Sequence, residues 1–217
     1  MANIRIPIQP EGCYHIYNHA VGDEDLFREE NNCIVFVEGV KQRLLPFSEL
    51  LAYCLMKNHF HLLMRMKTSD EMVVLWENKK KMLVEIHNNN HDVIRKPITT
   101  QDILESLILQ QFSHCFNSFA QHYNKRYDRT GGLLRQSFKR KLITDDDYFR
   151  RVVCYVHNNP VTHGFAEQPG DWKFSSYNAM LTDKPTVVKR EEVIETFGGL
   201  ENFLYLHKLW LGNDLEE

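Results

Sequence analysis

The residues best suited to chemistry are two histidines separated by one position, His59 and His61. On a β-strand, side chains two positions apart project to the same face, so both imidazoles point to one side and Phe60 points to the other. Two neighbouring imidazoles can share one metal ion. The chain has 11 histidines, so one His-x-His pair also arises readily by chance, and a purely structural pair is the alternative.

A second candidate pair lies much further along the chain. Tyr155 and Asn159 are four residues apart and therefore share one helix face, just before Pro160, which is expected to end the helix. A phenol beside a metal-bound phosphate can act as a nucleophile, because the cation favours phenoxide. The Asn159 amide oxygen would add a hard ligand, which favours Mg²⁺ or Mn²⁺ over structural zinc. The alternative is a buried tyrosine followed by an Asn-Pro stop.

Spacing alone does not decide which tyrosine would be the nucleophile. Tyr148 lies seven residues before Tyr155, two helical turns back on a similar face. The aspartates at 145–147 directly precede it and would repel a phosphate. Tyr123 and Tyr127 lie near basic residues, where they can instead stack on nucleic-acid bases.

The charges are distributed unevenly along the chain, although the formal net charge is only −3. Residues 121–141 contain seven basic residues and a single acid, Asp128. The basic residues are Lys125, Arg126, Arg129, Arg135, Lys139, Arg140 and Lys141. The segment from Glu191 onward is acidic instead. A basic stripe on a neutral-to-acidic body is expected of a protein that binds a phosphate backbone, and a solvated surface is the alternative.

The elements that must position these residues follow from hydrophobic periodicity and from helix and turn signals. With 217 residues, 43% of them hydrophobic and 25% charged, the chain can bury a core and form one domain with a modest extension. Strands are expected over residues 14–19, 49–56, 60–66 and 138–143. Helices are expected over residues 29–44, 71–87, 103–127, 144–158 and 189–211, with a turn at 88–92. This order predicts an α+β fold, a mainly antiparallel sheet with helices packed on it.

Several classes of protein are disfavoured by composition. The five cysteines are scattered and form no CxxC pair, which argues against a disulfide framework and a thiolate zinc site and fits a reducing cytoplasm. The longest apolar run, residues 50–56, is too short to cross a bilayer, and residues 1–7 lack a secretory apolar region. We therefore expect a cytoplasmic protein with no membrane contact.

A set of motifs occurs in a fixed order along residues 10–180. They are Lys-Asn-His-Phe-His-Leu-Leu at 57–63, Tyr-Asn-Lys-Arg-Tyr at 123–127, the segment 131–138, Tyr-Val-His-Asn-Asn-Pro-Val at 155–161 with His163-Gly164, and Trp172 with Phe-Ser-Ser-Tyr at 174–177. Together these motifs resemble the single-tyrosine HUH transposases, and in particular their REP-associated tyrosine transposase branch.

The resemblance implies a ferredoxin-like βαββαβ(α) core at residues 10–180, with an insertion at about 68–97 and a helical extension at 181–217. It implies that His59, His61 and Asn159 bind Mg²⁺ or Mn²⁺ and that Tyr155 is the nucleophile. The reaction implied is cleavage of single-stranded DNA, leaving a 5′-phosphotyrosine and a free 3′-hydroxyl. Single-stranded or hairpin DNA is the implied partner of a monomer or homodimer. The residues expected to hold its phosphates are Lys125, Arg126, Arg129, Arg135, Lys139 and Arg140.

Three other functions remain open at this point. The first is a domesticated hairpin-binding protein that no longer cleaves DNA. The second is a replication-initiating nuclease, but a two-tyrosine initiator would need a second tyrosine three or four residues from Tyr155, and the sequence has none there. The third is an unrelated metallohydrolase, which would turn over small phosphoesters without a covalent adduct.

Overall fold

The structure is a computed structural model that describes residues 6–75 and 100–210. Its centre is a four-stranded sheet in the order β2-β3-β1-β4, with every neighbouring pair antiparallel. The strands are β1 (Cys13–His19), β2 (Ser48–Met56), β3 (His59–Met66) and β4 (Lys139–Leu142). Helix α1 (Glu30–Arg43) connects β1 to β2, and helix α3 (Thr100–Arg126) precedes β4. This is the ferredoxin-like α+β arrangement that the sequence predicts.

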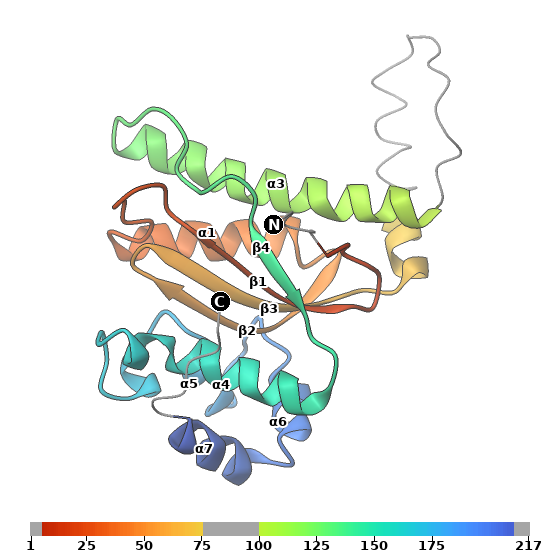
Figure 1. Ribbon diagram of the computed structural model, residues 1–217, viewed down its shortest axis with the longest axis vertical. Helices are drawn as coiled ribbons and strands as arrows, with labels where there is room; N and C mark the ends of the chain where they lie inside the picture. The colour runs from red at the N-terminus through yellow and green to blue at the C-terminus, as the bar shows by residue number, and fades with distance from the viewer. Residues whose placement is uncertain (1–5, 76–99, 211–217) are drawn as a thin grey trace, which may run out of the picture.

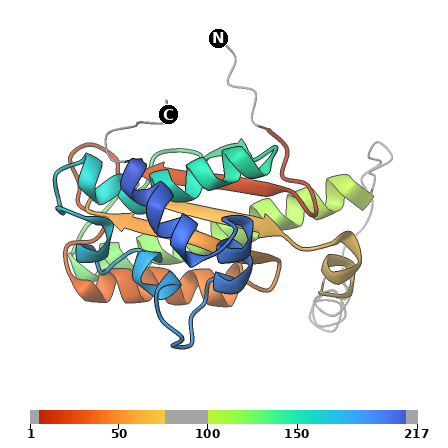
Figure 2. The ribbon, with the colours of Figure 1, turned by 90° about the horizontal axis from the view of Figure 1, so that it is seen from below.

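Helices cover both faces of the sheet. Helices α1 and α3 lie side by side on one face, and α4 (Asp146–Thr162) lies on the other (Figure 1, Figure 2). Between the sheet and the first helix layer, the Phe60 ring lies 4.7 Å from that of Phe36 on α1 and 5.1 Å from that of Phe116 on α3. The odd-numbered histidines of β3 therefore face the other layer, which contains α4.

Two central strands carry the histidines in register. In the β1–β3 ladder, His19 pairs with His59 and Tyr17 pairs with His61. Cross-strand partners project to the same face of a sheet. One face of the sheet therefore carries a compact group of imidazole and phenol rings beneath α4.

Helix α4 begins where the sequence predicts, but it ends later than the sequence predicts. The Asp145 side chain caps it by accepting a hydrogen bond of 2.8 Å from the backbone N–H of Tyr148. The expected end near residue 158 is wrong, because the helix continues to Thr162 with Pro160 inside it. Proline removes only one N–H donor, and the buried ring of Pro160 packs in this last part of the helix. The backbone N–H of His163 still reaches the Asn159 carbonyl at 3.1 Å.

The expected single helix over residues 189–211 is also wrong. The structure has α6 (Arg190–Thr196) and α7 (Leu200–Leu209), which are separated at Gly198 and Gly199. Both glycines have positive φ values, 77° and 116°, a backbone conformation that terminates helices and is open to glycine without strain.

The remaining connections are short elements or lie outside the described residues. The sequence did not predict the 3₁₀ turn η1 (Pro169–Asp171) or α5 (Tyr177–Met180), which lie between α4 and α6. Of the helix expected over residues 71–87, the structure describes a helical start at 69–75; the remainder and the turn at 88–92 lie outside the described residues. Among the described helices, none is both long enough and apolar enough to cross a membrane.

Candidate active site

The structure brings together the four residues that the sequence selects for chemistry. The ring centroids of His59 and His61 on β3 are 5.0 Å apart, with an interplanar angle of 86°. From α4, the Tyr155 ring lies 5.4 Å from the His61 ring, and the Asn159 Oδ1 atom lies 3.0 Å from His59 Nε2. All four residues are buried, with at most 5% of their surface exposed. The strand and the helix thus place two imidazoles, a phenol and an amide in one cluster.

His59 lies between two amide oxygens. Its Nδ1 atom is 2.8 Å from Asn58 Oδ1, and its Nε2 atom is 3.0 Å from Asn159 Oδ1. A neutral imidazole has one N–H, so His59 can donate to only one of these two amide oxygens. If a cation were bound on the Asn159 side, His59 Nε2 and Asn159 Oδ1 could both be its ligands.

The donor set fits a hard divalent cation. Within the described residues, no group of three or more His, Cys, Asp or Glu side chains is arranged to hold a metal ion. A site built here therefore depends on His59, His61 and the Asn159 amide oxygen, a set of nitrogen and oxygen donors without thiolate. The Asn159 Nδ2 group is buried and has no hydrogen-bond partner among the described residues. This N–H donor can be satisfied by an acceptor oxygen, such as that of a bound phosphate, while the Asn159 Oδ1 atom faces the cation.

A third histidine, His15 on β1, contacts this cluster. Its Nε2 atom lies 3.0 Å from His61 Nδ1, and its ring lies edge-on to Tyr155 at 5.8 Å. Burial, reinforced by the neighbouring His15, holds the pKa of His61 well below 6.5. His61 is therefore a neutral imidazole with a lone pair for a ligand. Sequence alternation places His15, Tyr17 and His19 on one face of β1, but only the β1–β3 register brings that face to His61.

The site contains a second tyrosine that sequence reasoning did not select. The Tyr17 ring is stacked 5.8 Å from His61 and 4.9 Å from His15, and it is buried. Tyr148 instead lies two turns before Tyr155, with the Arg151 guanidinium 5.5 Å from its ring centroid. Among the described tyrosines, Tyr17 and Tyr155 are those whose rings contact His61.

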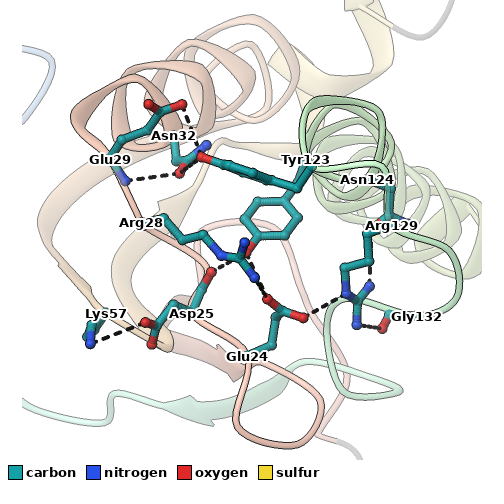
Figure 3. Close-up of polar contacts among 11 residues, drawn as sticks. Glu24, Asp25, Arg28, Glu29, Asn32, Lys57, Tyr123, Asn124, Arg129 and Gly132 are labelled. Carbon is teal, nitrogen blue, oxygen red and sulfur yellow. Dashed lines mark hydrogen bonds and ion pairs between the residues drawn. The ribbon is translucent and has the colours of Figure 1, made fainter.

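Tyr123 and Tyr127 connect the end of α3 to the segment that leads into α1, and Figure 3 shows the contact of Tyr123. The Tyr123 hydroxyl bonds to Glu24 Oε1 at 3.0 Å, and the Tyr127 hydroxyl bonds to Glu29 Oε1 at 3.0 Å. Burial and the Glu24 carboxylate raise the pKa of Tyr123 above its ordinary value. Because Tyr123 is fully buried, the suggestion that it stacks on bases is wrong.

Comparison with known proteins adds independent observations. No family model matches the chain. A Haemophilus influenzae protein described as a REP-associated tyrosine transposase is 28% identical over 154 residues, which cover 71% of this chain and 68% of that protein. The chain is similar in sequence to this REP-associated tyrosine transposase. A solved structure of a REP-associated tyrosine transposase bound to a REP hairpin shares the fold, with a TM-score of 0.51 at 16% identity, covering 85% of this chain and 88% of that one.

The basic residues of segment 121–141 are partly neutralised by ion pairs within the chain. Arg126 pairs with Glu29 at 3.2 Å. Arg129 pairs with Glu24 at 2.8 Å (Figure 3). Arg129 also donates to the Gly132 carbonyl at 2.9 Å. The Arg140 side chain is 7% exposed and lies 3.9 Å from Glu105.

The other three predicted phosphate contacts are exposed and have no ion pair given by the structure. These residues are Lys125, Arg135 and Lys139. The Lys139 ammonium lies 5.5 Å from the centroid of the Tyr17 ring, which places this cation at the imidazole face of the sheet. The roles assigned to all six basic residues stay predictions, and the geometry favours these three over the paired arginines.

Proposed function

We propose that the chain is a metal-dependent endonuclease and strand transferase for single-stranded DNA that carries a hairpin, with Tyr155 as its nucleophile. The observation that supports this proposal most is the cluster itself. A phenol on α4 lies against His61 while the amide one turn later lies against His59. The similarity to REP-associated tyrosine transposases, one of which is solved with a REP hairpin, supports the same substrate class.

In this proposal, His59, His61 and Asn159 hold one Mg²⁺ or Mn²⁺ ion. When bound, the ion supplies positive charge beside the scissile phosphate. Phosphoryl transfer depends mainly on positioning and charge stabilisation, which suits a buried and rigid donor set. The neutral state of His61 keeps its lone pair available at physiological pH.

The covalent step uses the Tyr155 hydroxyl. Its oxygen attacks the scissile phosphorus, its proton leaves to water, and the bond from phosphorus to the 3′-oxygen breaks. The products are a 5′-phosphotyrosine and a strand that ends in a 3′-hydroxyl after protonation. Attack by another 3′-hydroxyl reverses the step and joins strands, because the phosphotyrosine conserves the bond energy.

The burial of Tyr155 sets a condition on this reaction. With 5% of the residue exposed, the phenol is covered in the free protein by the sheet and α4. DNA must therefore displace part of this cover when it binds. The same burial favours the second candidate function, a protein that binds hairpins without cleaving them.

The test is incubation of the protein with labelled hairpin oligonucleotides that carry single-stranded flanks, with and without Mn²⁺, followed by denaturing gels. The wild type is expected to form a covalent adduct only with the metal, and Tyr155→Phe is expected to form none while still binding the hairpin. Tyr148→Phe is the matched control, and Tyr17→Phe tests the other tyrosine whose ring contacts His61. An adduct that persists in Tyr155→Phe would move the nucleophile to another residue. Binding without an adduct under any divalent ion would favour the hairpin-binding protein.

A further inference from the structure

A further histidine contacts the cluster from the end of α4. His163 follows the last residue of this helix, and its ring lies 5.5 Å from the His59 ring at an interplanar angle of 72°. His163 is exposed, whereas His59, His61 and Tyr155 are buried. No other described residue hydrogen-bonds to the His163 ring. An imidazole beside the cluster is therefore available to a bound substrate.

The backbone at the end of α4 fixes the position of this ring. The Phe165 N–H donates to the Pro160 carbonyl at 2.8 Å. The Gly164 N–H donates to the Val161 carbonyl at 3.0 Å. These two bonds form a Schellman motif, in which Gly164 takes the left-handed position with a φ of 72°. His163 directly precedes this glycine, so its backbone is held within the motif.

His163 lies in line with the two residues that α4 contributes to the site. Tyr155, Asn159 and His163 are four residues apart and therefore follow one side of the helix. The neighbouring rings follow the same direction. The Tyr155 ring lies 5.4 Å from His61, and the His61 ring lies 5.0 Å from His59, which contacts His163. Tyr155 and His163 thus lie at opposite ends of this row, about 12 Å apart along the helix axis.

This order suits the geometry of phosphoryl transfer. The attacking and leaving oxygens lie roughly in line, on opposite sides of the phosphorus. If the Tyr155 hydroxyl attacks, the leaving 3′-oxygen lies on the side away from Tyr155, which is the side of His163. An imidazole N–H is a hydrogen-bond donor that can stabilise negative charge as it develops on that oxygen.

The structure argues against a role of His163 as a third imidazole ligand. Among the described residues, no three His, Cys, Asp or Glu side chains are grouped so that they could hold one metal ion. His163 is therefore not arranged to share an ion with His59 and His61. A DNA atom is the better partner for its N–H.

We propose that His163 is a catalytic residue that donates a hydrogen bond to the 3′-oxygen leaving group. The proposal rests on the proposed function for its reaction. As the Tyr155 oxygen bonds to phosphorus, the bond from phosphorus to the 3′-oxygen breaks, and its electron pair goes to that oxygen. The oxygen accepts the hydrogen bond from His163 and takes its proton from water, so the imidazole keeps its N–H. In the reverse step, the same N–H orients the attacking 3′-hydroxyl.

The test compares two leaving groups in single-turnover reactions of the full chain with Mn²⁺. The scissile position is first mapped with the wild type on a labelled hairpin oligonucleotide that carries single-stranded flanks. A second oligonucleotide then carries sulfur in place of the 3′-oxygen at that position. A thiolate is a weak hydrogen-bond acceptor and a more stable anion than an alkoxide, so its departure does not depend on a donor.

We expect His163→Ala to slow cleavage of the 3′-oxygen substrate about 100-fold, as for the loss of one donor to a developing oxyanion. The same variant should cleave the 3′-sulfur substrate at the rate of the wild type. His163→Gln keeps an N–H donor and should recover part of the rate on the 3′-oxygen substrate. His122→Ala, at an exposed position on α3, is the matched control.

Two measurements without cleavage accompany these rates. Hairpin affinity from fluorescence anisotropy and Mn²⁺ affinity from electron paramagnetic resonance should be unchanged in His163→Ala. Equal slowing of both substrates, or of neither, would overturn the role of His163 and leave the Tyr155 reaction in place. A loss of Mn²⁺ affinity would also overturn it, because His163 would then be a metal ligand. Absence of an adduct in the wild type on both substrates would overturn this role and the proposed function together.

Discussion

At the scale of residues, the candidate site depends on how each imidazole is held. His61 Nδ1 is engaged by His15 at 3.0 Å, which leaves Nε2 as the nitrogen for ligation. Histidine ligands in metal sites are commonly oriented by such a partner on the second ring nitrogen. His15 is accordingly a positioning residue for His61 in our account.

The first prediction concerns His15. His15→Ala should lower the Mn²⁺ affinity of the DNA-free protein about 10- to 100-fold, because His61 loses the partner that fixes its ring. His15→Gln should restore part of the affinity, since its amide oxygen can accept the His61 N–H. The Mn²⁺ affinities of both variants are measured by following free Mn²⁺ with electron paramagnetic resonance. His122→Ala, at an exposed position on α3, is the control. An unchanged affinity in His15→Ala would remove His15 from the site.

Residue types and spacing gave His59 with His61 and Tyr155 with Asn159 as candidate pairs, but the choice of Tyr155 over the other tyrosines came from the family resemblance. Strand alternation and helical spacing are local rules, and each pair follows one of them. His15 and Tyr17 were not selected, because their proximity to His61 depends on the β1–β3 register and not on any local pattern. The pairing of Arg129 with Glu24 likewise joins residues far apart in sequence, so a count of basic residues overestimates the available positive charge.

At the scale of elements, α4 is held between the sheet and the C-terminal helices. His157 on the back of α4 bonds to Ser176 Oγ at 2.7 Å and to His207 Nε2 at 2.9 Å. His207 Nδ1 in turn bonds to the Phe203 carbonyl at 2.7 Å. Each ring donates through one nitrogen and accepts through the other, so both histidines are neutral in this chain of bonds. This series of hydrogen bonds anchors α4, the helix that carries Tyr155, to α7.

These buried histidines predict that the protein loses stability in acid. Burial lowers the pKa of His207 to about 4 and that of His157 well below 6.5. As the pH falls, the unfolded chain binds these protons before the folded protein does. The contribution of the two neutral histidines to the free energy of unfolding is therefore complete above about pH 6.5 and is lost as the pH falls toward about 4. For His207 alone, the loss in the free energy of unfolding approaches about 3 kcal/mol.

The measurement is the free energy of unfolding in urea across this pH range. His207→Gln should be less stable near neutral pH but show a shallower decline than the wild type, since one titrating group is absent. Comparing the two proteins separates this effect from the carboxylates that titrate at the lower end. Equal slopes in the two proteins would show that His207 does not titrate as we expect.

Element order was predictable, whereas two helix ends were not. Hydrophobic periodicity and capping residues predicted the four strands, α1, α3 and the start of α4. Pro160 is tolerated inside α4 because the surrounding contacts outweigh one lost hydrogen bond. The break falls at Gly198 and Gly199, whose positive φ ends the helix, and a reading of hydrophobic periodicity alone runs through it.

At the scale of the whole molecule, the balance of charge determines how DNA can be held. The formal net charge is −3, and several arginines of the basic segment are paired within the chain. Binding must therefore rely on a few exposed cations placed beside the sheet edge. The exposed members for which the structure gives no ion pair are Lys125, Arg135 and Lys139, whereas Arg126 is exposed but pairs with Glu29.

We predict that hairpin affinity depends on salt through these residues. Lys125→Ala and Lys139→Ala should each weaken binding and reduce the slope of log affinity against log salt by about 0.7 to 0.9, the value for one phosphate contact. Lys184→Ala, in the exposed loop between α5 and α6, should leave the slope unchanged. Fluorescence anisotropy at several salt concentrations measures the slopes. A change with Lys184→Ala as large as that with Lys139→Ala would indicate nonspecific attraction.

The central claim is that the phenol of Tyr155 forms a covalent bond to DNA in the cluster beneath α4. The most direct measurement is mass spectrometry of the protein after incubation with hairpin DNA and Mn²⁺, nuclease trimming and proteolysis. We expect the residual nucleotide mass on the peptide that contains Tyr155, with its phosphate attached to the phenolic oxygen. A nucleotide attached instead to Tyr17 or Tyr148, or to no peptide while the hairpin is bound, would contradict the account.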